Sequence, residues 1–326
     1  MSVAADSAAK PPVVVVTGPT SAGKSALAIE LAEKFDGEIV NADSMQVYRY
    51  MDIGTAKPTP EQRARLPHHL FDVVTPDVPY NAGRYVVEAR RAATGIHARG
   101  KLVVLTGGSG LYIRVFLEGL LAAGAADPEL RERLERDDVR ARAEGHPEHL
   151  HERLRAVDPE AAARIHPNDA RRIIRALEIV QHTGQPSAWL REAQRGADRP
   201  YRSLQLALDP GRETLDRRID SACTRMLEAG LLREVRWLCD RRYGPELTPM
   251  QSIGYRHLLP VVQGSDTLLN ALAAMQRDTR RFARRQRTWL RGVGEARWFD
   301  PAARGEIFAA VEEFLRPADA RETYSV

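Results

Sequence analysis

The chain has 326 residues, of which 43% are hydrophobic and 28% charged, and its formal net charge is +4. These values are typical of a globular protein, and no apolar run approaches the ~18 residues of a membrane-spanning helix. Residues 1–11 lack the basic start and apolar stretch of a signal peptide, so we expect a disordered tail there and a cytoplasmic protein. Cys223 and Cys239 offer neither a disulfide framework nor a zinc-binding spacing.

The first predicted strand leads into a phosphate-binding sequence. Val13 to Val16 predict a buried strand, residues 18–25 fit the pattern G-x-x-x-x-G-K-[ST], and the next ten residues have a helical apolar face. In such a P-loop, glycines let backbone N–H groups converge on an anion at a helix N-terminus, the lysine reaches phosphate oxygens, and the hydroxyl can hold Mg²⁺. We therefore predict a phosphorylated ligand, bound by Gly18, Pro19, Thr20, Ser21, Ala22, Gly23, Lys24 and Ser25.

Strands and helices alternate as far as residue 119. Strands are expected at 38–42, around 70–74 and after Lys101, with a helix over 80–100. This alternation predicts a parallel α/β sheet whose ligands bind at the C-terminal strand ends. Asp43 and the turn at 106–110 both follow strands at that edge, beside the P-loop.

Asp43 is the acid expected closest to the bound phosphates. The strand after Lys101 ends in Thr106, whereas an ordinary P-loop ATPase carries an aspartate at such a position to hold Mg²⁺. The residues leave three roles open for Asp43: an indirect magnesium ligand, a general base, or a turn-capping residue. ATP hydrolysis therefore does not follow from the P-loop alone.

Residues 120–200 change character, because they contain no strand-like run and are rich in charge. They predict a helical insertion of short amphipathic helices. A strand is then expected at 203–209, helices at roughly 212–240, 251–262 and 266–291, a strand at 296–300 and a helix at 305–315. The predicted fold class is α/β: a P-loop NTPase-like parallel sheet flanked by helices, formed by 12–119 and 201–315, with an all-helical insertion domain at 120–200 and a disordered tail at 317–326.

The predicted helix at 266–291 carries seven arginines within an arc of about 160° at 100° per residue. They are Arg277, Arg280, Arg281, Arg284, Arg285, Arg287 and Arg291, and the opposite side carries Leu272, Met275, Phe282, Trp289 and Leu290. This face is either a solvated surface of an arginine-rich protein or a contact surface for nucleic-acid phosphates. Gln286 lies in the middle of the apolar side, where a buried amide either closes a structural network or points into a ligand cavity.

Several of these segments together resemble the tRNA dimethylallyltransferase family, also called tRNA isopentenyltransferases. The resemblance runs in order from about Val13 to Phe299 and includes GPTSAGKS, NADSMQVYRYMDIGTAKP, LTGGSGLYI, HPNDARRIIRALEI, SIGYRH and TRRFARRQRTWLR. It implies transfer of a dimethylallyl group from dimethylallyl diphosphate to the exocyclic N6 of the adenosine 3′ of a tRNA anticodon. The P-loop would hold the diphosphate leaving group, with Mg²⁺ at Ser25. The chain is similar to the bacterial form, without the zinc module of eukaryotic relatives.

The resemblance also implies individual roles. Asp43 would accept the proton from N6, while Lys24, Arg218 and Thr106 would act with it at the diphosphate; Arg217 is distinguished from Arg218 only by the alignment of Ile219. The insertion would grip the anticodon stem, and the target base would leave its stack. Positions that match tRNA contacts are Asp43, Ser44, Met45, Gln46, Ser109, Arg171, Arg172, Ile173, Ile174, Arg175, Ile253, Gly254, Tyr255 and Arg256, to which the arginine helix adds Arg281, Arg284 and Gln286.

Three alternative functions remain: one with a different acceptor, one with a different reaction and one without a reaction. An adenylate isopentenyltransferase would use free AMP or ATP, but a mononucleotide needs neither the insertion nor the arginine face. A P-loop small-molecule kinase would leave the same features unexplained, and an RNA-binding module would not need Lys24, Ser25 and Asp43 together. We therefore expect dimethylallyl diphosphate and a tRNA anticodon stem-loop as partners and Mg²⁺ as cofactor, with no membrane and no obligate protein partner.

Overall fold

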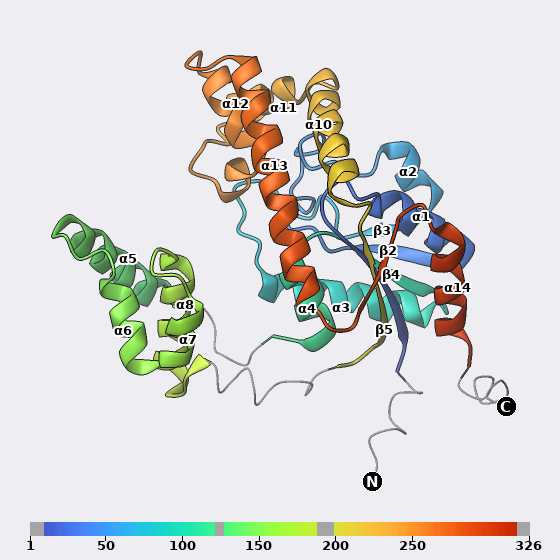
Figure 1. Cartoon of the computed structure of the whole chain (residues 1–326), viewed down its shortest axis with the longest axis horizontal. Coiled ribbons are helices and arrows are strands. Elements are labelled where there is room, and N and C mark those ends of the chain that lie inside the picture. The colour runs from blue at the N-terminus through green and yellow to red at the C-terminus, as the bar shows by residue number, and fades with distance from the viewer. Residues whose placement is uncertain (1–9, 121–126, 188–198, 318–326) are drawn as a thin grey trace, which may run out of the picture. The chain divides into compact units, whose positions relative to one another are not determined.

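The computed structural model describes residues 10–120, 127–187 and 199–317. The chain divides into two compact units, the first formed by residues up to Leu117 and from Pro200 onward, the second by Glu118–Arg199 (Figure 1). Of the tails expected at 1–11 and 317–326, all but residues 10, 11 and 317 lie outside the described residues. In the described part of the chain, no helix has the length and apolar character needed to cross a membrane.

The first unit is built on a parallel sheet. Among the described residues it has six strands, in the order β3-β2-β4-β1-β5-β6. Val16 and Asn41 both pair with Thr106, so β1, β2 and β4 end at the same edge. This confirms the predicted α/β class. The strands are β1 Pro12–Thr17, β2 Gly37–Asn41, β3 His68–His69, β4 Leu102–Thr106, β5 Arg202–Leu208 and β6 Ala296–Phe299.

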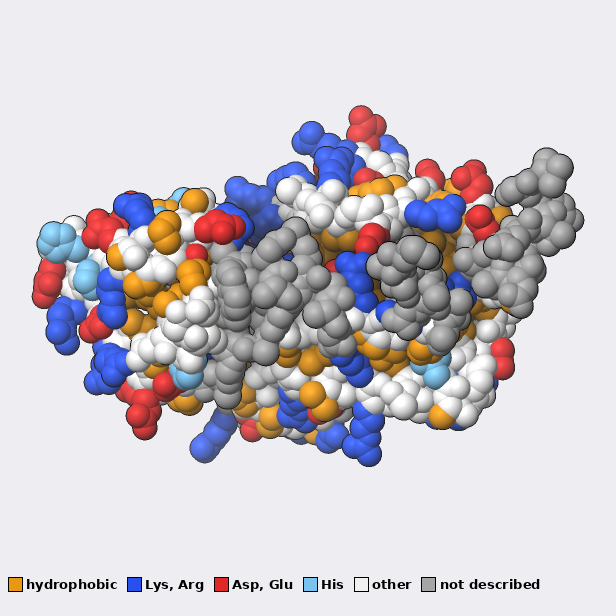
Figure 2. Space-filling model, turned by 90° about the horizontal axis from the view of Figure 1, so that it is seen from below, with side chains coloured by type: hydrophobic (Ala, Val, Ile, Leu, Met, Phe, Trp, Pro, Cys, Tyr) orange, Lys and Arg blue, Asp and Glu red, His pale blue; other side chains and the backbone are white. Residues whose placement is uncertain are grey.

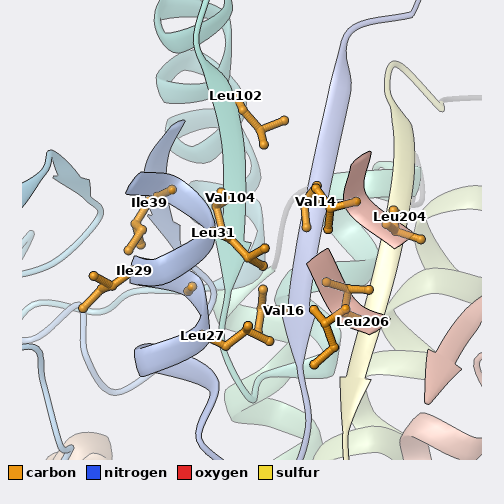
Figure 3. Packing of buried hydrophobic residues seen from close by; sticks show 14 of the residues in the cluster. Val14, Val16, Leu27, Ile29, Leu31, Ile39, Leu102, Val104, Leu204 and Leu206 are labelled. Carbon is orange, nitrogen blue, oxygen red and sulfur yellow. The ribbon is translucent and has the colours of Figure 1, made fainter. Parts of the chain in front are cut away.

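Helices cover both faces of the sheet, because side chains along each strand alternate between the faces. Val14 and Val16 share a core with α1 (Lys24–Lys34) and α14 (Arg304–Leu315), where Leu27 and Leu31 lie beside the strands (Figure 3). Val13 and Val15 instead share a core with α3 (Ala82–Ala98) and α4 (Gly110–Glu118). The four-valine run is therefore a strand buried on both sides, as its composition predicts.

A further layer of helices packs over the loop that follows β2. It consists of α10 (Arg212–Glu228), α11 (Leu231–Asp240), α12 (Tyr255–Val262) and the long α13 (Leu268–Arg291), with a 3₁₀ turn at Thr248–Gln251, and these helices gather in Figure 1. Their buried residues form one cluster with Val47, Tyr48 and Met51. The short α2 (Pro60–Arg65) lies elsewhere along the same loop region.

Two predicted elements are wrong. The single helix expected at 212–240 is divided into α10 and α11, because Gly230 adopts a left-handed backbone with φ of 105°. The strand expected around 70–74 is replaced by β3, which ends at His69, because Leu70 and Asp72 have φ of 65° and 54° and a strand does not allow such values. Val74 makes only an isolated bridge with Tyr48.

All the regular secondary structure in the described residues of the second unit is helical. It contains α5 (Pro128–Ala143), α6 (His149–Val157), α7 (Pro159–Arg164) and α8 (Ala170–Thr183), which share a core that includes Leu134, Leu154 and Ile173. Figure 2 shows acidic, basic and histidine side chains spread over this unit, at the left of the view. A small apolar core under a highly charged surface accounts for the change in composition at this part of the sequence.

Candidate active site

The P-loop connects β1 to α1 and has the backbone geometry that its glycines predict. Gly18 has φ of 146°, and a Cβ there would lie 2.6 Å from the carbonyl oxygen of Leu208, so only glycine fits. Gly23, with φ of 97°, precedes α1, and among the described residues no side chain caps the N-terminus of that helix. The first N–H groups of α1 are therefore left to bind an anion, with the exposed Ser25 beside them.

Lys24 and Asp43 form the charged centre of this edge. The Lys24 ammonium donates a hydrogen bond to the Pro19 carbonyl oxygen at 2.8 Å. Burial lowers the pKa of Lys24 to about 8, and the nearby charge of Asp43 partly opposes that shift. Burial also raises the pKa of Asp43, against the N–H groups of Met45 and Gln46 and the charge of Lys24. A cation and a carboxylate with shifted pKa values, close enough to sense each other, are typical of a catalytic site.

The Asp43 carboxylate is held in a fixed turn at the end of β2. Its Oδ1 accepts a hydrogen bond from the Met45 N–H at 2.9 Å, so Asp43 does stabilise its own turn. Asn41, buried at the end of the strand, accepts from the Asp43 N–H at 2.9 Å and donates to the Asp43 carbonyl at 3.1 Å. The turn-capping role therefore coexists with a carboxylate that is oriented before any substrate binds.

The turn after β4 is joined to the Asp43 turn. The Ser109 hydroxyl oxygen accepts a hydrogen bond from the Ser44 N–H at 2.9 Å and lies 3.1 Å from the Ser44 hydroxyl. Thr106, the buried last residue of β4, accepts from the Ala42 N–H through its carbonyl at 2.7 Å. Residues expected near the diphosphate and the base are thus brought together at one edge of the sheet.

Gln286, on α13, joins the P-loop to the turn after β4. Its Oε1 accepts from the Thr20 N–H at 2.8 Å, and its Nε2 donates to the Gly108 carbonyl at 3.1 Å. The side chain is buried, and a Cβ on Gly108 would lie 2.5 Å from Nε2. Of the two interpretations that the sequence left open, these contacts support the structural network. The Thr20 N–H is occupied by this bond and is not a phosphate donor here.

The arginines of α13 divide into two groups. Arg287 pairs with Asp209 at 2.7 Å, with the two side chains only 17% and 15% exposed, and Arg280 pairs with Asp220. The other five are exposed: Arg277 and Arg281 lie 3.3 and 3.6 Å from Asp278, Arg291 is at the end of the helix, and Arg281, Arg284 and Arg285 line a hollow of about 540 Å³ together with Thr288 and Trp289. Phe282, expected on the apolar side, is 37% exposed. The surface that could contact nucleic acid is therefore narrower than the seven-arginine face.

Several residues expected at the tRNA have buried side chains. Ile173 and Ile174 lie in the core of the helical unit, and Tyr255 is fully buried with its hydroxyl donating to Glu234 at 2.6 Å. Contacts of these three side chains with RNA are therefore not expected, and this corrects the sequence interpretation. Their neighbours Arg171, Arg172 and Arg256 are exposed, as are Arg217 and Arg218 on α10.

Sequence reasoning missed two residues that hold the loop after Asp43. The Glu234 carboxylate accepts hydrogen bonds from the N–H groups of Asp52, Ile53 and Gly54 at 3.0, 2.8 and 3.2 Å, as well as from Tyr255. The Gln46 amide donates to the Thr55 carbonyl at 2.9 Å, within the same loop.

Lys57 is the second missed residue. Its side chain is 2% exposed, and its ammonium is paired with Asp52 at 2.7 Å and Asp72 at 2.6 Å. Lysine is rare in this chain, with five among 48 basic residues. That scarcity could therefore have indicated a fixed role for Lys57.

Comparison with known proteins assigns the chain to a family. A family model described as IPP transferase matches residues 46–293, and one described as Isopentenyl transferase matches residues 11–69. The chain belongs to the IPP transferase family. The resemblance found in the sequence motifs is thereby confirmed, and so is the expectation of an enzyme of the transferase class.

Curated and solved relatives of this IPP transferase support the same family assignment. The tRNA dimethylallyltransferase of Syntrophobacter fumaroxidans is 50% identical over 291 residues, 89% of this chain and 84% of its own. The tRNA dimethylallyltransferase of Geobacter metallireducens is 49% identical, over 93% of this chain and 97% of its own. The full-length tRNA isopentenylpyrophosphate transferase of Bacillus halodurans has a TM-score of 0.70 at 34% identity, over 97% and 100% of the two chains. A eukaryotic dimethylallyltransferase acting on tRNA has a TM-score of 0.77 at 29% identity, over 96% of this chain and 77% of its own.

Proposed function

We propose that this chain transfers the dimethylallyl group of dimethylallyl diphosphate to the exocyclic N6 of the adenosine on the 3′ side of a tRNA anticodon, with release of diphosphate. Its curated relatives are named as tRNA dimethylallyltransferases. The observation that carries the proposal is the position of Lys24 in the P-loop and of Asp43 in the turn after β2 at the same sheet edge, where the charge of each affects the pKa of the other. This reaction needs both a cation for the departing diphosphate and an acceptor for the amine proton.

The P-loop would stabilise the leaving group. Breaking the allylic C–O bond leaves both electrons on the diphosphate, so negative charge develops there during the reaction. The N–H groups at the start of α1 and the Lys24 ammonium are oriented beforehand to meet that charge. Mg²⁺ takes most of its ligands from phosphate oxygens and water, so the single exposed hydroxyl of Ser25 suits it, and the ion would neutralise part of the charge. Arg218 is the further cation that we assign to the diphosphate.

Asp43 would act as the general base. As the adenine N6 forms its bond to the allylic carbon, it must lose a proton, and the Asp43 carboxylate accepts it. The raised pKa brings this carboxylate closer to the operating pH, which favours proton transfer. The hydrogen bonds from Met45 and to Asn41 hold the group in place, so little reorganisation is needed when the base arrives.

The tRNA would be held by surfaces outside the P-loop. Arg281, Arg284 and Arg285 line a hollow of about 540 Å³, and three guanidinium groups suit RNA phosphates. In the helical unit the exposed Arg171 and Arg172 have the same chemistry. The target base must leave its stack to reach Asp43, as in other enzymes that modify bases. Ser44, Met45 and Gln46 follow Asp43 in the same turn and Ser109 is bonded to that turn, and we assign these residues to the base and its neighbours.

The test compares acceptors directly. Purified protein is incubated with dimethylallyl diphosphate, Mg²⁺ and unmodified tRNA whose anticodon is followed by adenosine, and digested nucleosides are weighed by mass spectrometry. AMP is the parallel acceptor, and Lys24→Ala is the inactive control. Prenylated adenosine from tRNA alone supports the proposal, and mass-spectrometric sequencing of ribonuclease fragments of the same tRNA locates it. Prenylation of AMP alone would replace the proposal with an adenylate isopentenyltransferase.

A further inference from the structure

Three aromatic rings from distant parts of the sequence meet on the surface of the first unit. The ring centroid of Tyr50 lies 5.1 Å from that of Trp237 and 6.5 Å from that of Tyr243, and the two tyrosine rings are within 25° of parallel. Tyr50 and Trp237 remain 41% and 36% exposed. The Arg241 guanidinium lies 3.6 Å from the centroid of Trp237. Stacked rings and a guanidinium plane are thus presented to solvent together.

The backbone at this cluster is held in conformations that side chains rarely adopt. Tyr50 has φ of 70°. Arg242 has φ of 63° because it forms the left-handed end of α11, where the Tyr243 N–H donates to the Leu238 carbonyl at 3.1 Å. Left-handed backbone at bulky residues is strained, and such strain persists where the surroundings enforce it, often at functional sites. Glu234 links the two segments that carry the rings, because it accepts hydrogen bonds from the N–H groups of residues 52–54, just after Tyr50, and lies one helical turn before Trp237 on α11. The loop that carries Tyr50 and the helix α11 that carries Trp237 are therefore held together.

We propose that Tyr50, Trp237, Tyr243 and Arg241, here named the aromatic platform, stack an unpaired base of the bound tRNA outside the transfer site. This inference rests on the proposed function. Bases that leave their stack in RNA loops are commonly received on aromatic faces and guanidinium planes. A platform of three rings and one guanidinium matches that ligand.

Position favours RNA over another occupant. Arg241 and Arg242 are exposed at the rings, and so are the acids Asp77, Asp240 and Glu246, so net charge does not select the occupant and the ring and guanidinium faces do. Tyr50 follows Asp43 by seven positions, and that length of chain spans at most about 25 Å. A tRNA with its target adenosine at Asp43 is therefore within reach of the aromatic platform. If this surface bound a protein instead, removing its rings would not change the affinity for tRNA.

The experiment measures the Kd for unmodified tRNA over a series of salt concentrations. The double variant Tyr50→Ala with Trp237→Ala should bind roughly tenfold more weakly, since stacking of one base is lost. Its salt dependence should stay unchanged, because no phosphate-binding cation is removed. Tyr50→Phe with Trp237→Phe keeps both rings and should keep the wild-type Kd. Trp298→Ala, which removes a ring that is 37% exposed on β6, serves as the matched control.

The outcomes separate this inference from the proposed function. An unchanged Kd in the alanine double variant overturns the aromatic platform, even if the wild-type protein prenylates tRNA. An equal loss in the phenylalanine variant overturns it as well, because the rings are still present there. A wild-type protein that binds tRNA but transfers no prenyl group counts against the proposed function instead. Turnover of the alanine variant at saturating tRNA should remain close to wild type, which shows that the fold and the transfer site are intact.

Discussion

Replacing Gln286 by alanine removes the side chain that joins the P-loop to the turn after β4. The Thr20 N–H and the Gly108 carbonyl then lose the bonds of 2.8 and 3.1 Å that they make to it. A buried polar group without a partner costs about 1–3 kcal/mol, so the P-loop arrangement that binds diphosphate is disfavoured by roughly that amount. Since about 1.4 kcal/mol corresponds to a factor of ten, we expect kcat/KM for dimethylallyl diphosphate to fall roughly 5- to 150-fold.

The assay is the initial rate of prenyl transfer at saturating tRNA over a range of dimethylallyl diphosphate concentrations, with the Kd for tRNA measured separately. Gly108→Ala should have a similar effect, because its Cβ would lie 2.5 Å from the amide nitrogen of Gln286 and displace it. The two changes together should be less than additive, since they break the same contact. A wild-type kcat/KM for the diphosphate combined with a weakened Kd for tRNA would refute this reasoning and make Gln286 an RNA contact.

Three further predictions follow from charges and hydrogen bonds. Because the pKa of Lys24 is about 8, its ammonium loses its charge as the pH rises through that value, so kcat/KM for dimethylallyl diphosphate should decline above about pH 8 in a pH–rate profile. Arg281→Ala combined with Arg284→Ala should weaken tRNA binding and lower the slope of log K against log salt by roughly 1.4–1.8. Glu234→Ala leaves the buried Tyr255 hydroxyl without its acceptor and frees three backbone N–H groups, so we expect a loss of about 2 kcal/mol and a Tm lower by roughly 4–8 °C in calorimetry.

Each of these predictions has a control or a contrary result. Arg65→Ala removes an exposed arginine that pairs with Glu33 at 2.7 Å, and it should leave the salt slope unchanged. An equal slope change in Arg65→Ala would mean that the arginines of α13 act only through net charge. A rate that stays flat up to pH 10 would contradict the lowered pKa of Lys24. An unchanged Tm in Glu234→Ala would show that the loop at 52–54 does not depend on that carboxylate.

The sheet edge was predictable because its signals are local. A P-loop pattern between a four-valine strand and an amphipathic helix specifies its own backbone, and polar residues directly after apolar strands must lie at the same edge of a parallel sheet. Lys24, Asp43 and Ser109 therefore come together as the sequence indicates. The division of the helix at Gly230 also had a local signal, since a glycine there favours a left-handed helix end.

Other features depend on residues that are distant in sequence. Gln286 bonds to groups 266 and 178 residues away, and Glu234 bonds to a loop 180 to 182 residues away, so no local pattern could assign their partners. The misplaced strand has a similar cause. Leu70 accepts a hydrogen bond from Asn41 at 3.0 Å and takes a left-handed conformation that its apolar sequence does not indicate.

The most direct test of the mechanism is the single-turnover rate of prenyl transfer by Asp43→Asn, measured with its Kd for tRNA. Asparagine keeps an oxygen that can accept from the Met45 N–H, so the turn at the end of β2 should be preserved. It cannot take the proton from N6, and general-base catalysis is worth roughly 10²- to 10⁴-fold. We expect tRNA binding close to wild type and transfer at least about 100-fold slower. Transfer at the wild-type rate would contradict the assignment of Asp43 as the base.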